Sequence, residues 1–382
     1  MKKKPIDFLK NDLYAKILLC LLTIAGLAFM ILKCLSAEIW QDEIYTLSIV
    51  SYSYKDMLNA IAGDVHPPLY YLILKAIMDF AKMVYPEVNT VLLARIASMM
   101  PYVILMVISG TLVLKTFGAK VALAFGFMIT FMPKFMLFNI TIRMYSLGVI
   151  SVTLTYLLFY LIAFEKHNMY IAFSLCALAA MYTHYFAAVS VAVLLLHMLI
   201  FLLMERRSVL RLCVSTFVIA VCYMPWFLVA LRQMSRVLED YWIPPLSLRT
   251  FLGVASFVVC PPVNNDYYDG IICFAVAVLY LYSWIRLWSK NKKILFFSVA
   301  GFNMVAITAL FGIAISFLNR PIFIVRYLMP SLGAFWFSYA IWYKEADCRD
   351  KVIIKISYIV LTILGIISTV IFEQRSLVVL MS

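Results

Sequence analysis

Uncharged apolar segments long enough to cross a lipid bilayer recur along this chain, and they limit its fold more than any other feature. The first is 17–32, and comparable segments follow almost to the last residues. A helix that rises about 1.5 Å per residue crosses a hydrocarbon core of about 30 Å with roughly 20 residues. Because the segments are continuous rather than alternating, they predict membrane-spanning helices and not the strands of a membrane β-barrel.

The composition excludes a water-soluble domain. Of the 382 residues, 65% are hydrophobic and 13% are charged, and the mean hydropathy is +0.98; soluble domains carry about 25% charged residues. The same figures exclude disordered, collagenous and disulfide-scaffold chains. The eight cysteines include no CxxC pair, so we interpret them as packing residues rather than as disulfides or a metal site.

Eleven membrane-spanning helices are predicted, which makes this an all-α polytopic membrane protein. The segment 169–204 is too long for one helix, so it is expected to turn near Thr183-His184-Tyr185 and to supply two. The segment 17–32 follows three lysines, but no small-x-small cleavage site follows it, so it is retained as a span. The segments are 17–32, 96–114, 121–133, 144–164, 169–204, 212–231, 270–285, 294–319, 327–343 and 356–372.

The short apolar stretch 68–85 carries Lys75, Asp79 and Lys82, and its placement decides which loops share a side of the membrane. If it lies on the outer surface as an amphipathic helix, the cytoplasmic segments hold 19 of the 32 basic and 7 of the 19 acidic residues, a net charge of +12 out of +13. The positive-inside rule favours this arrangement. The rival, in which 68–85 spans and 169–204 is one helix, needs an overlong helix. The cytoplasmic segments are 1–16, 115–120, 164–168, 204–211, 286–293 and 344–355.

This topology places the N-terminus inside and the C-terminus outside, and it leaves two large outer-face segments, 36–95 and 232–269. We expect residues 1–382 to form one membrane-embedded module without a soluble C-terminal domain. Because the cytoplasmic loops account for most of the net charge, the basic excess gives no reason to expect a nucleic-acid partner.

Acidic residues gather on the predicted outer face. Asp42 and Glu43 follow the first span, and Asp64 and His66 precede the surface helix. An acidic pair at this depth can begin an interfacial helix, where carboxylates favour the positive end of the helix dipole, or can act as a general base. The four side chains could hold a divalent metal, although no ligand spacing requires one.

Cations and aromatic residues lie at the ends of predicted spans on the same side, where positive charge should be scarce. A lone cation at a span end usually extends to the headgroups, but several together would suit a phosphate held by bidentate guanidinium contacts. These polar residues are Lys134, Arg143 with Tyr145, His184 with Tyr185, and Arg320 with Arg326 and Tyr327.

Taken in order, these residues resemble the GT-C superfamily of glycosyltransferases that use polyprenyl-phosphate sugars. The branch they resemble contains protein O-mannosyltransferases and the bacterial aminoarabinose transferases that modify lipid A. The resemblance covers residues from about 10 to about 345. Its motifs are Asp42-Glu43-x-Tyr45, Asp64-Val-His66-Pro67-Pro68-Leu-Tyr70-Tyr71, Arg143-x-Tyr145, Thr183-His184-Tyr185 and Arg326-Tyr327, with Pro225-Trp226, Gln233 and Tyr241-Trp242-Ile243-Pro244-Pro245 similar to the bacterial members.

The resemblance implies a fold with surface helices in a long first outer loop and an inverting sugar transfer on the outer face of a bacterial plasma membrane. The donor would be a polyprenyl-phosphate sugar, and the acceptor a glycan, a lipid or a protein. Asp42 matches the family's catalytic aspartate, and Glu43 would position Asp42, the acceptor or a metal. The lipid-phosphate ligands would be Arg143, Tyr145, Arg320, Arg326 and Tyr327.

His66 stands where the aminoarabinose transferases have a lysine that contacts the lipid phosphate, so it could bind phosphate, acceptor or metal. The acceptor or metal candidates are Asp64, His66, His184 and Tyr185. Two alternatives are a flippase or transporter of lipid-linked sugars and a catalytically inactive GT-C-like assembly subunit. A flippase predicts ionisable residues distributed through the mid-membrane, whereas here they gather at one face.

Overall fold

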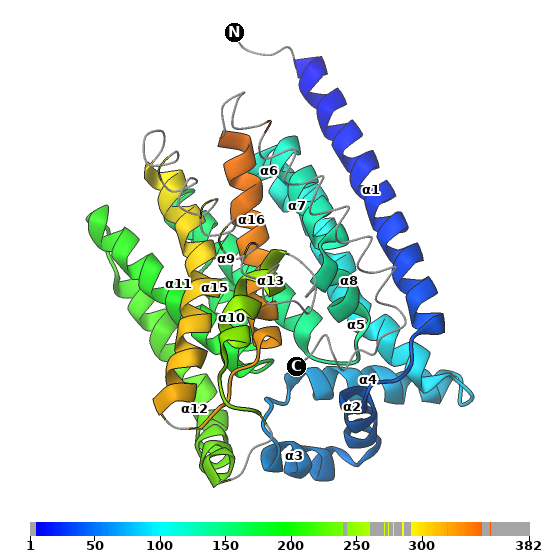
Figure 1. The fold of residues 1–382 in the computed structure, drawn as a ribbon. Helices are drawn as coiled ribbons and strands as arrows, with labels where there is room; N and C mark the ends of the chain where they lie inside the picture. The colour runs from blue at the N-terminus through cyan, green and yellow to red at the C-terminus, as the bar shows by residue number, and fades with distance from the viewer. Residues whose placement is uncertain are drawn as a thin grey trace.

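The computed structural model describes residues 5–239, 243–259, 292–318 and 320–345, together with the isolated residues 271, 274, 278, 285 and 352. Every regular element in these ranges is a helix, and most of the helices form one bundle (Figure 1). The elements are α1 Pro5–Ser36, α2 Gln41–Ser51, α3 Tyr54–Gly63, α4 Leu69–Val84, α5 Thr90–Ile108, the π-helix η1 Ser109–Val113, α6 Leu114–Phe117, α7 Ala119–Phe131, α8 Pro133–Ile140, α9 Tyr145–Ala163, α10 Tyr170–Met181, α11 Tyr185–Met204, α12 Leu210–Glu239, α13 Leu248–Val259, α15 Lys292–Leu318, the 3₁₀ helix η2 Val325–Leu328 and α16 Met329–Glu345.

The predicted fold class is confirmed, and nine of the eleven predicted spans fall on described helices. Within the described ranges, six helices are long and apolar enough to cross a membrane, and α7 with α8 forms a pair bent by 65° that would make a seventh. The segment 169–204 divides as expected, because α10 ends at Met181 and α11 begins at Tyr185. The predicted spans 270–285 and 356–372 lie outside the continuous described ranges.

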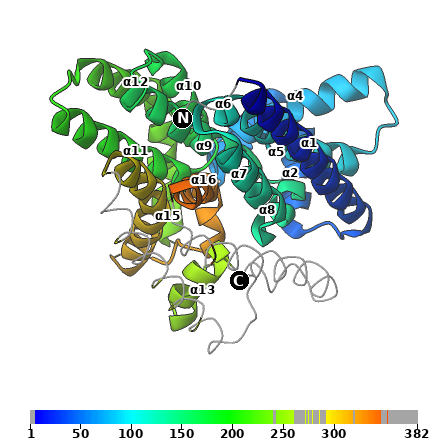
Figure 2. The ribbon, with the colours of Figure 1, turned by 90° about the horizontal axis from the view of Figure 1, so that it is seen from above.

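Helix α9 lies at the centre of the bundle (Figure 2), where it packs against α5, α10, α11 and α16. Nearly all of its residues are buried, whereas α1 and α12 expose one apolar side each. Apolar side chains gain little from leaving lipid for another helix, so close packing at small residues holds such a bundle together. Gly301 of α15 provides one such approach, because it lies directly against Ser338 and Ala334 of α16.

The loops predicted to be cytoplasmic lie together at one end of the bundle. Figure 1 shows α6 at the same end as the N-terminus. The Nζ of Lys293 lies 2.9 Å from the Oε2 of Glu205, and Arg207 donates hydrogen bonds to the carbonyl oxygens of Ala163 and Ile162. The described parts of these predicted loops therefore share one side, as the charge distribution requires.

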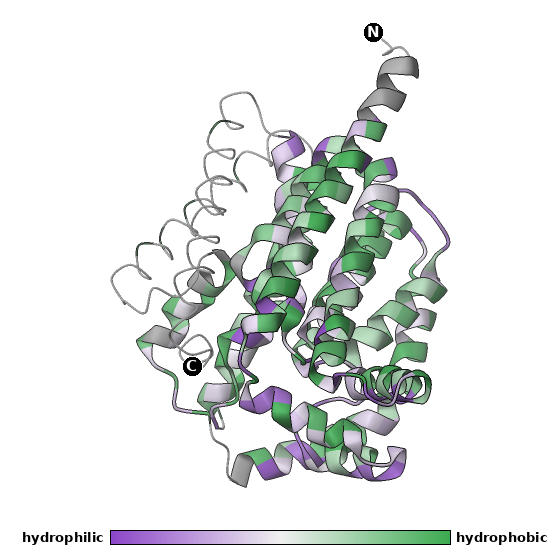
Figure 3. Cartoon of the chain, turned by 90° about the vertical axis from the view of Figure 1, so that its right-hand side faces the viewer, coloured by the Kyte–Doolittle hydropathy of each residue, from purple (hydrophilic) through white to green (hydrophobic). Residues whose placement is uncertain are grey.

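The first long connection, 36–95, folds at the opposite end. Figure 1 shows α4 lying across the bundle rather than along it, next to α2 and α3, so the structure agrees with a surface helix and not with the rival span. Tyr70, Tyr71, Leu74 and Met78 of α4 are buried against neighbouring helices. Figure 3 shows hydrophilic residues gathered in these crosswise helices and hydrophobic residues along the bundle.

The close approach of α15 and α16 gives a test of this packing. A Cβ added at Gly301 would lie 2.0 Å from Ser338 Oγ and 2.7 Å from the Ala334 carbonyl oxygen, so Gly301→Ala must push the helices apart. We expect a loss of about 1–3 kcal/mol of folding free energy, typical of an overpacked core. Thermal unfolding in detergent measures it. Gly110→Ala is the control, because its Cβ would meet nothing closer than 3.7 Å; equal melting temperatures for the two variants would contradict the packing described.

Candidate functional site

Two adjacent carboxylates at the start of α2 have different surroundings. The side chain of Glu43 accepts a hydrogen bond from the backbone N–H of Trp40, the N-cap residue, and so stabilises the first turn of the helix. Successive residues on a helix point about 100° apart, so Asp42 and Glu43 face different neighbours. Glu43 is 2% exposed, whereas the side chain of Asp42 is 30% exposed. Asp42 is therefore the carboxylate that a substrate can reach.

Glu43 is fixed by a buried ion pair with Arg95 of α5. The Oε2 of Glu43 lies 3.2 Å from Arg95 Nη2, and its Oε1 accepts a hydrogen bond of 2.8 Å from the backbone N–H of Ile142. Both carboxylate oxygens of Glu43 are thus occupied by protein donors. The contacts join α2 to α5 and to the 141–144 loop that carries Arg143.

Arg95 also closes the end of the first membrane helix. Its guanidinium donates to the carbonyl oxygens of Cys34, Ala37 and Glu38 at 2.9–3.0 Å. The last carbonyls of a helix lack partners within it, and a cation there is favoured by the helix dipole. Sequence reasoning missed Arg95. The signal that could have found it is a charged residue one turn inside an apolar helix, which is costly unless it has a partner.

Two buried guanidinium groups flank the carboxylate of Asp42. The Oδ2 of Asp42 lies 3.9 Å from Arg143 Nε and 3.6 Å from Arg326 Nη2. Arg326 belongs to η2, and its guanidinium lies 5.0 Å from the ring centre of Trp40. The distances from the carboxylate are longer than hydrogen bonds. Within the described ranges, the Nε of Arg143 is buried and has no hydrogen-bond partner.

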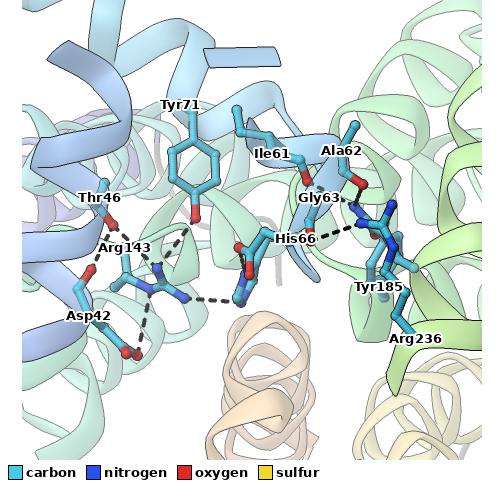
Figure 4. Close-up of polar contacts among 12 residues, drawn as sticks. Asp42, Thr46, Ile61, Ala62, Gly63, His66, Tyr71, Arg143, Tyr185 and Arg236 are labelled. Atoms are coloured by element: carbon cyan, nitrogen blue, oxygen red, sulfur yellow. Dashed lines mark hydrogen bonds and ion pairs between the residues drawn. The ribbon is translucent and has the colours of Figure 1, made fainter. Parts of the chain in front are cut away.

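Three other side chains orient Arg143. Its Nη1 donates to the hydroxyl oxygens of Thr46 and Tyr71, each at 3.3 Å, and its Nη2 lies 3.0 Å from the Nε2 of His66 (Figure 4). The partners come from α2, from α4 and from the loop between α3 and α4. Arg143 therefore holds the crosswise helices against the end of the bundle.

The partners of His66 determine its protonation. An arginine can only donate, so Nε2 of His66 must accept from Arg143, and Nδ1 must carry the proton that is donated to Asp64 Oδ2 at 2.8 Å. Burial and the charge of Arg143 lower the pKa of His66 against the opposing effect of Asp64. Burial alone would raise the pKa of Asp64, but the hydrogen bond with His66 and the charges around it outweigh burial and lower it. The pair is therefore a neutral imidazole beside a carboxylate.

His184 and Tyr185 lie at the turn between α10 and α11. The Nδ1 of His184 accepts a hydrogen bond of 3.1 Å from the backbone N–H of Phe186 and caps α11. Burial, followed by the positive neighbours Arg143 and Arg326, holds the pKa of His184 well below its ordinary value. The hydroxyl of Tyr185 donates to Gln233 Oε1. His184 is thus bonded to α11 and Tyr185 to α12.

A cavity of about 340 Å³ adjoins this cluster between α11, α12 and α15. Its walls are mainly apolar and include Phe227 and Leu231 of α12 and Phe311 of α15. The lining also includes His66, His184 and Tyr327. Of these, His66 contacts Arg143, and the ring of His184 lies against the ring of Tyr327. The wall of the cavity is therefore mostly apolar, and one of its polar lining residues, His66, contacts Arg143.

The structure brings most of the predicted residues together. The charged cluster consists of Asp42, Arg143 and Arg326. It is adjoined by Asp64 and His66. Around them lie further predicted residues that line the cavity or are buried beside it, namely His184, Tyr185, Tyr327 and Tyr145.

The remaining predicted residues lie elsewhere or in other surroundings. Glu43 is turned away into its ion pair with Arg95. Arg320 is half-buried two residues beyond the end of α15, and its role stays a prediction. Tyr241 and Trp242 lie outside the described residues. In the described ranges, no three His, Cys, Asp or Glu side chains converge as metal ligands would.

Comparison with protein-family models and with curated protein sequences finds no match. Among solved structures, the chain is similar to ArnT from Cupriavidus metallidurans in the apo state, with a TM-score of 0.57 and 15% sequence identity. The match covers 94% of this chain and 65% of ArnT, so the chain spans less than two thirds of the length of that protein. At this identity the likeness establishes the fold alone, an all-helical polytopic membrane fold similar to that of ArnT.

The ion pair of Arg95 with Glu43 makes a prediction about stability. Removing one partner leaves a buried charge uncompensated, so Arg95→Ala should lower the free energy of unfolding by about 3–5 kcal/mol. Lys293→Ala is the matched control, because it breaks an exposed pair with Glu205 and such pairs contribute about 0–1 kcal/mol. Thermal unfolding in detergent measures both. A melting temperature for Arg95→Ala as high as that of the control would refute the stabilising role of the ion pair between Arg95 and Glu43.

The buried histidines predict a loss of stability in mild acid. Unfolded histidines bind a proton as the pH falls through about 6.5, whereas folded His66 and His184 bind it only at lower pH. Below pH 6.5 the unfolded chain therefore holds more protons, and each histidine lowers stability by up to about 1.4 kcal/mol per pH unit.

Melting temperatures between pH 7.5 and 5.5 check this acid sensitivity. His184→Asn keeps a side-chain acceptor for the helix cap but cannot titrate in this range, so its melting temperature should fall less than that of the wild type. His167→Asn, in the exposed loop after α9, should follow the wild type. The expectation fails if the His184 and His167 variants respond equally to acid.

Proposed function

We propose that this chain is an inverting glycosyltransferase that moves a sugar from a polyprenyl-phosphate donor to an acceptor hydroxyl at the membrane surface. One observation carries the proposal: a partly exposed carboxylate, Asp42, lies between two buried guanidinium groups beside an apolar cavity. The fold of the ArnT structure supports it. The finer points, namely the donor, the acceptor and the face of the membrane, rest on the resemblance of the motifs and on the charge of the loops.

The cavity and the arginines together match the two parts of such a donor. An isoprenoid chain is apolar and suits the walls formed by α11, α12 and α15, whereas a phosphate is an anion that guanidinium groups bind with geometric specificity. Arg143 is a candidate for contact with the phosphate, because its buried Nε has no hydrogen-bond partner in the described ranges. A phosphate oxygen would complete its hydrogen bonds.

In the proposed reaction, the acceptor oxygen attacks the anomeric carbon of the sugar on the side opposite the phosphate. The new bond joins acceptor and sugar, and the bond between the anomeric carbon and the phosphate oxygen breaks. Asp42 takes the proton of the acceptor hydroxyl, while Arg143 and Arg326 stabilise the negative charge that develops on the departing polyprenyl phosphate. Each such electrostatic contact is worth about 3 kcal/mol of barrier.

Several residues would position these groups rather than react. Glu43 fixes the first turn of α2 and, through the N–H of Ile142, the loop of Arg143. His66 and Asp64 orient Arg143 from the other side, which leaves His66 without a free nitrogen for a metal. We therefore assign His66 and Asp64 to Arg143 positioning, with the acceptor bound on the exposed side of Asp42.

We place the site on the extracytoplasmic face. The described loops at the other end of the bundle belong to the segments that hold +12 of the net charge of +13, and the positive-inside rule assigns such loops to the cytoplasm. Helix α2, which carries Asp42, lies at the opposite end with the other crosswise helices, α3 and α4 (Figure 1). A donor that reaches this face must already have its sugar on the outer leaflet.

Replacement of Asp42 tests the proposal. Asp42→Asn keeps the size of the side chain and removes the base, so transfer should fall by about 10²–10⁴-fold while expression and donor binding persist. Asp79→Asn is the control, since it makes the same chemical change on the exposed side of α4, where Asp79 pairs with Lys75. Mass spectrometry of cell-envelope glycans and glycolipids, in a deletion strain complemented with each variant, identifies the sugar and the acceptor.

The outcomes separate this function from its alternatives. Loss of a sugar modification with Asp42→Asn, and its restoration by Asp79→Asn, supports the transferase. Full restoration by Asp42→Asn would overturn the role of Asp42. A flippase is indicated instead if the purified protein moves a labelled lipid-linked sugar across a vesicle bilayer without transferring it, and an assembly subunit if it does neither.

A further inference from the structure

One group of motif residues, on α11 and α12, has no part in the reaction described above. Trp226 Nε1–H donates to the hydroxyl of Tyr185 at 3.1 Å, and that hydroxyl donates to Gln233 Oε1. The other end of the same amide, Gln233 Nε2–H, donates to the carbonyl oxygen of Ile61 at 2.9 Å. Gln233 is 2% exposed. The carboxamide oxygen of Gln233 thus contacts α11 in the bundle, and its nitrogen contacts α3, one of the crosswise helices.

The contact of Gln233 falls on the last turn of α3. Helix α12 supplies donors to the last carbonyls of α3. Gln233 donates to Ile61, whose carbonyl also accepts the N–H of Asp64. Arg236 Nη1 donates to the carbonyl of Gly63 at 3.3 Å (Figure 4). Asp64 follows immediately as the C-cap residue. The chain then enters the 64–66 segment, where Asp64 and His66 hold Arg143.

The same part of α12 forms a wall of the apolar cavity. Ala230, Leu231, Met234 and Val237 line it, and so does Gln233 itself. One helix therefore contacts both the space in which we place the donor's chain and the turn that leads to His66. No other residue of α12 combines a cavity wall position with a described hydrogen bond to α3.

We propose that Gln233 is a positioning residue for the transfer reaction: by donating to the end of α3 it fixes the 61–66 segment, and through His66 it sets the orientation of Arg143 beside Asp42. This inference rests on the proposed function for its kinetic part. Gln233 does not touch the reacting atoms. Its effect belongs to the turnover step, which depends on the placement of Arg143, rather than to the affinity for the donor's apolar chain.

Three variants separate positioning from ordinary packing. Gln233→Leu removes both contacts. Gln233→Glu keeps an acceptor for Tyr185, but it can donate to Ile61 only while its carboxyl is protonated. Asn303→Leu is the matched control, because Asn303 Nδ2 donates to His197 Nε2 at 3.2 Å between α15 and α11, an interhelical carboxamide contact outside the site.

The first measurement is the turnover of the purified full chain with the donor that the cell-envelope analysis identifies. Gln233→Leu should lower kcat at least 10-fold with KM for the donor changed less than 3-fold, whereas Asn303→Leu should keep kcat within 2-fold of the wild type. For Gln233→Glu, kcat relative to the wild type at the same pH should fall at least 10-fold between pH 6.5 and 8.5, because a buried carboxyl titrates well above its ordinary range. A ratio that does not vary with pH, or equal kcat values for the Gln233→Leu and Asn303→Leu variants, would overturn the proposal.

The second measurement does not need turnover. Amide hydrogen exchange followed by mass spectrometry should be at least 10-fold faster in peptides covering residues 61–67 for Gln233→Leu than for the wild type, and unchanged there for Asn303→Leu. If the wild type transfers no sugar, the proposed function fails and this exchange still reports on the link between α12 and α3. Unchanged exchange in Gln233→Leu contradicts the link whether or not the chain is a transferase.

Discussion

A buried guanidinium group needs hydrogen-bond acceptors, and this requirement at Arg143 organises the end of the molecule that carries Asp42. The acceptors are Thr46, His66 and Tyr71, with Asp42 close by. They lie 72–101 residues earlier in the chain, in three separate segments. An arginine without them would be buried unpaired, at a cost of several kcal/mol. The crosswise helices therefore pack around Arg143, and its Nε, which has no hydrogen-bond partner in the described ranges, lies 3.9 Å from Asp42 Oδ2.

Arg95 applies the same constraint to the neighbouring carboxylate, and the two arginines give the adjacent acids opposite fates. Arg95 holds Glu43 between the end of α1 and the loop at Ile142, so Glu43 has no oxygen left for a substrate. Arg143 and Arg326 approach Asp42 only to 3.9 and 3.6 Å, which leaves its carboxylate partly exposed. A pair of acids that looks equivalent in the sequence thus becomes one accessible group and one structural group.

The features that the sequence predicts well are those that depend on neighbouring residues. Hydropathy located the helices, the length of 169–204 required a break where His184 caps α11, and the charge of the loops put α4 on the surface. The burial of Glu43, the clamp of Arg95 and the contact of Gln233 with α3 depend on residues 52, 61 and 172 positions apart. No local pattern encodes such a distance. Family resemblance could therefore name Asp42, Arg143 and Gln233 as motif residues, but not the contacts that fix them.

The surroundings of Asp42 explain why a membrane scaffold suits the reaction that we propose. A lipid-linked donor has a long apolar part that is stabilised by burial and a phosphate that is stabilised by pairing with cations. Here an apolar cavity lined by His66 lies next to Arg143, which with Arg326 flanks Asp42. Binding the chain in the cavity fixes the direction in which the phosphate must point, which converts binding energy into orientation at the reacting carbon. Helix α12 forms one wall of the cavity and also holds α3 through Gln233. The cavity wall that would bind the donor's chain and the contacts that orient Arg143 are therefore connected through α12. In chains with this fold, a change in the donor's apolar chain should therefore be accompanied by a change in reactivity.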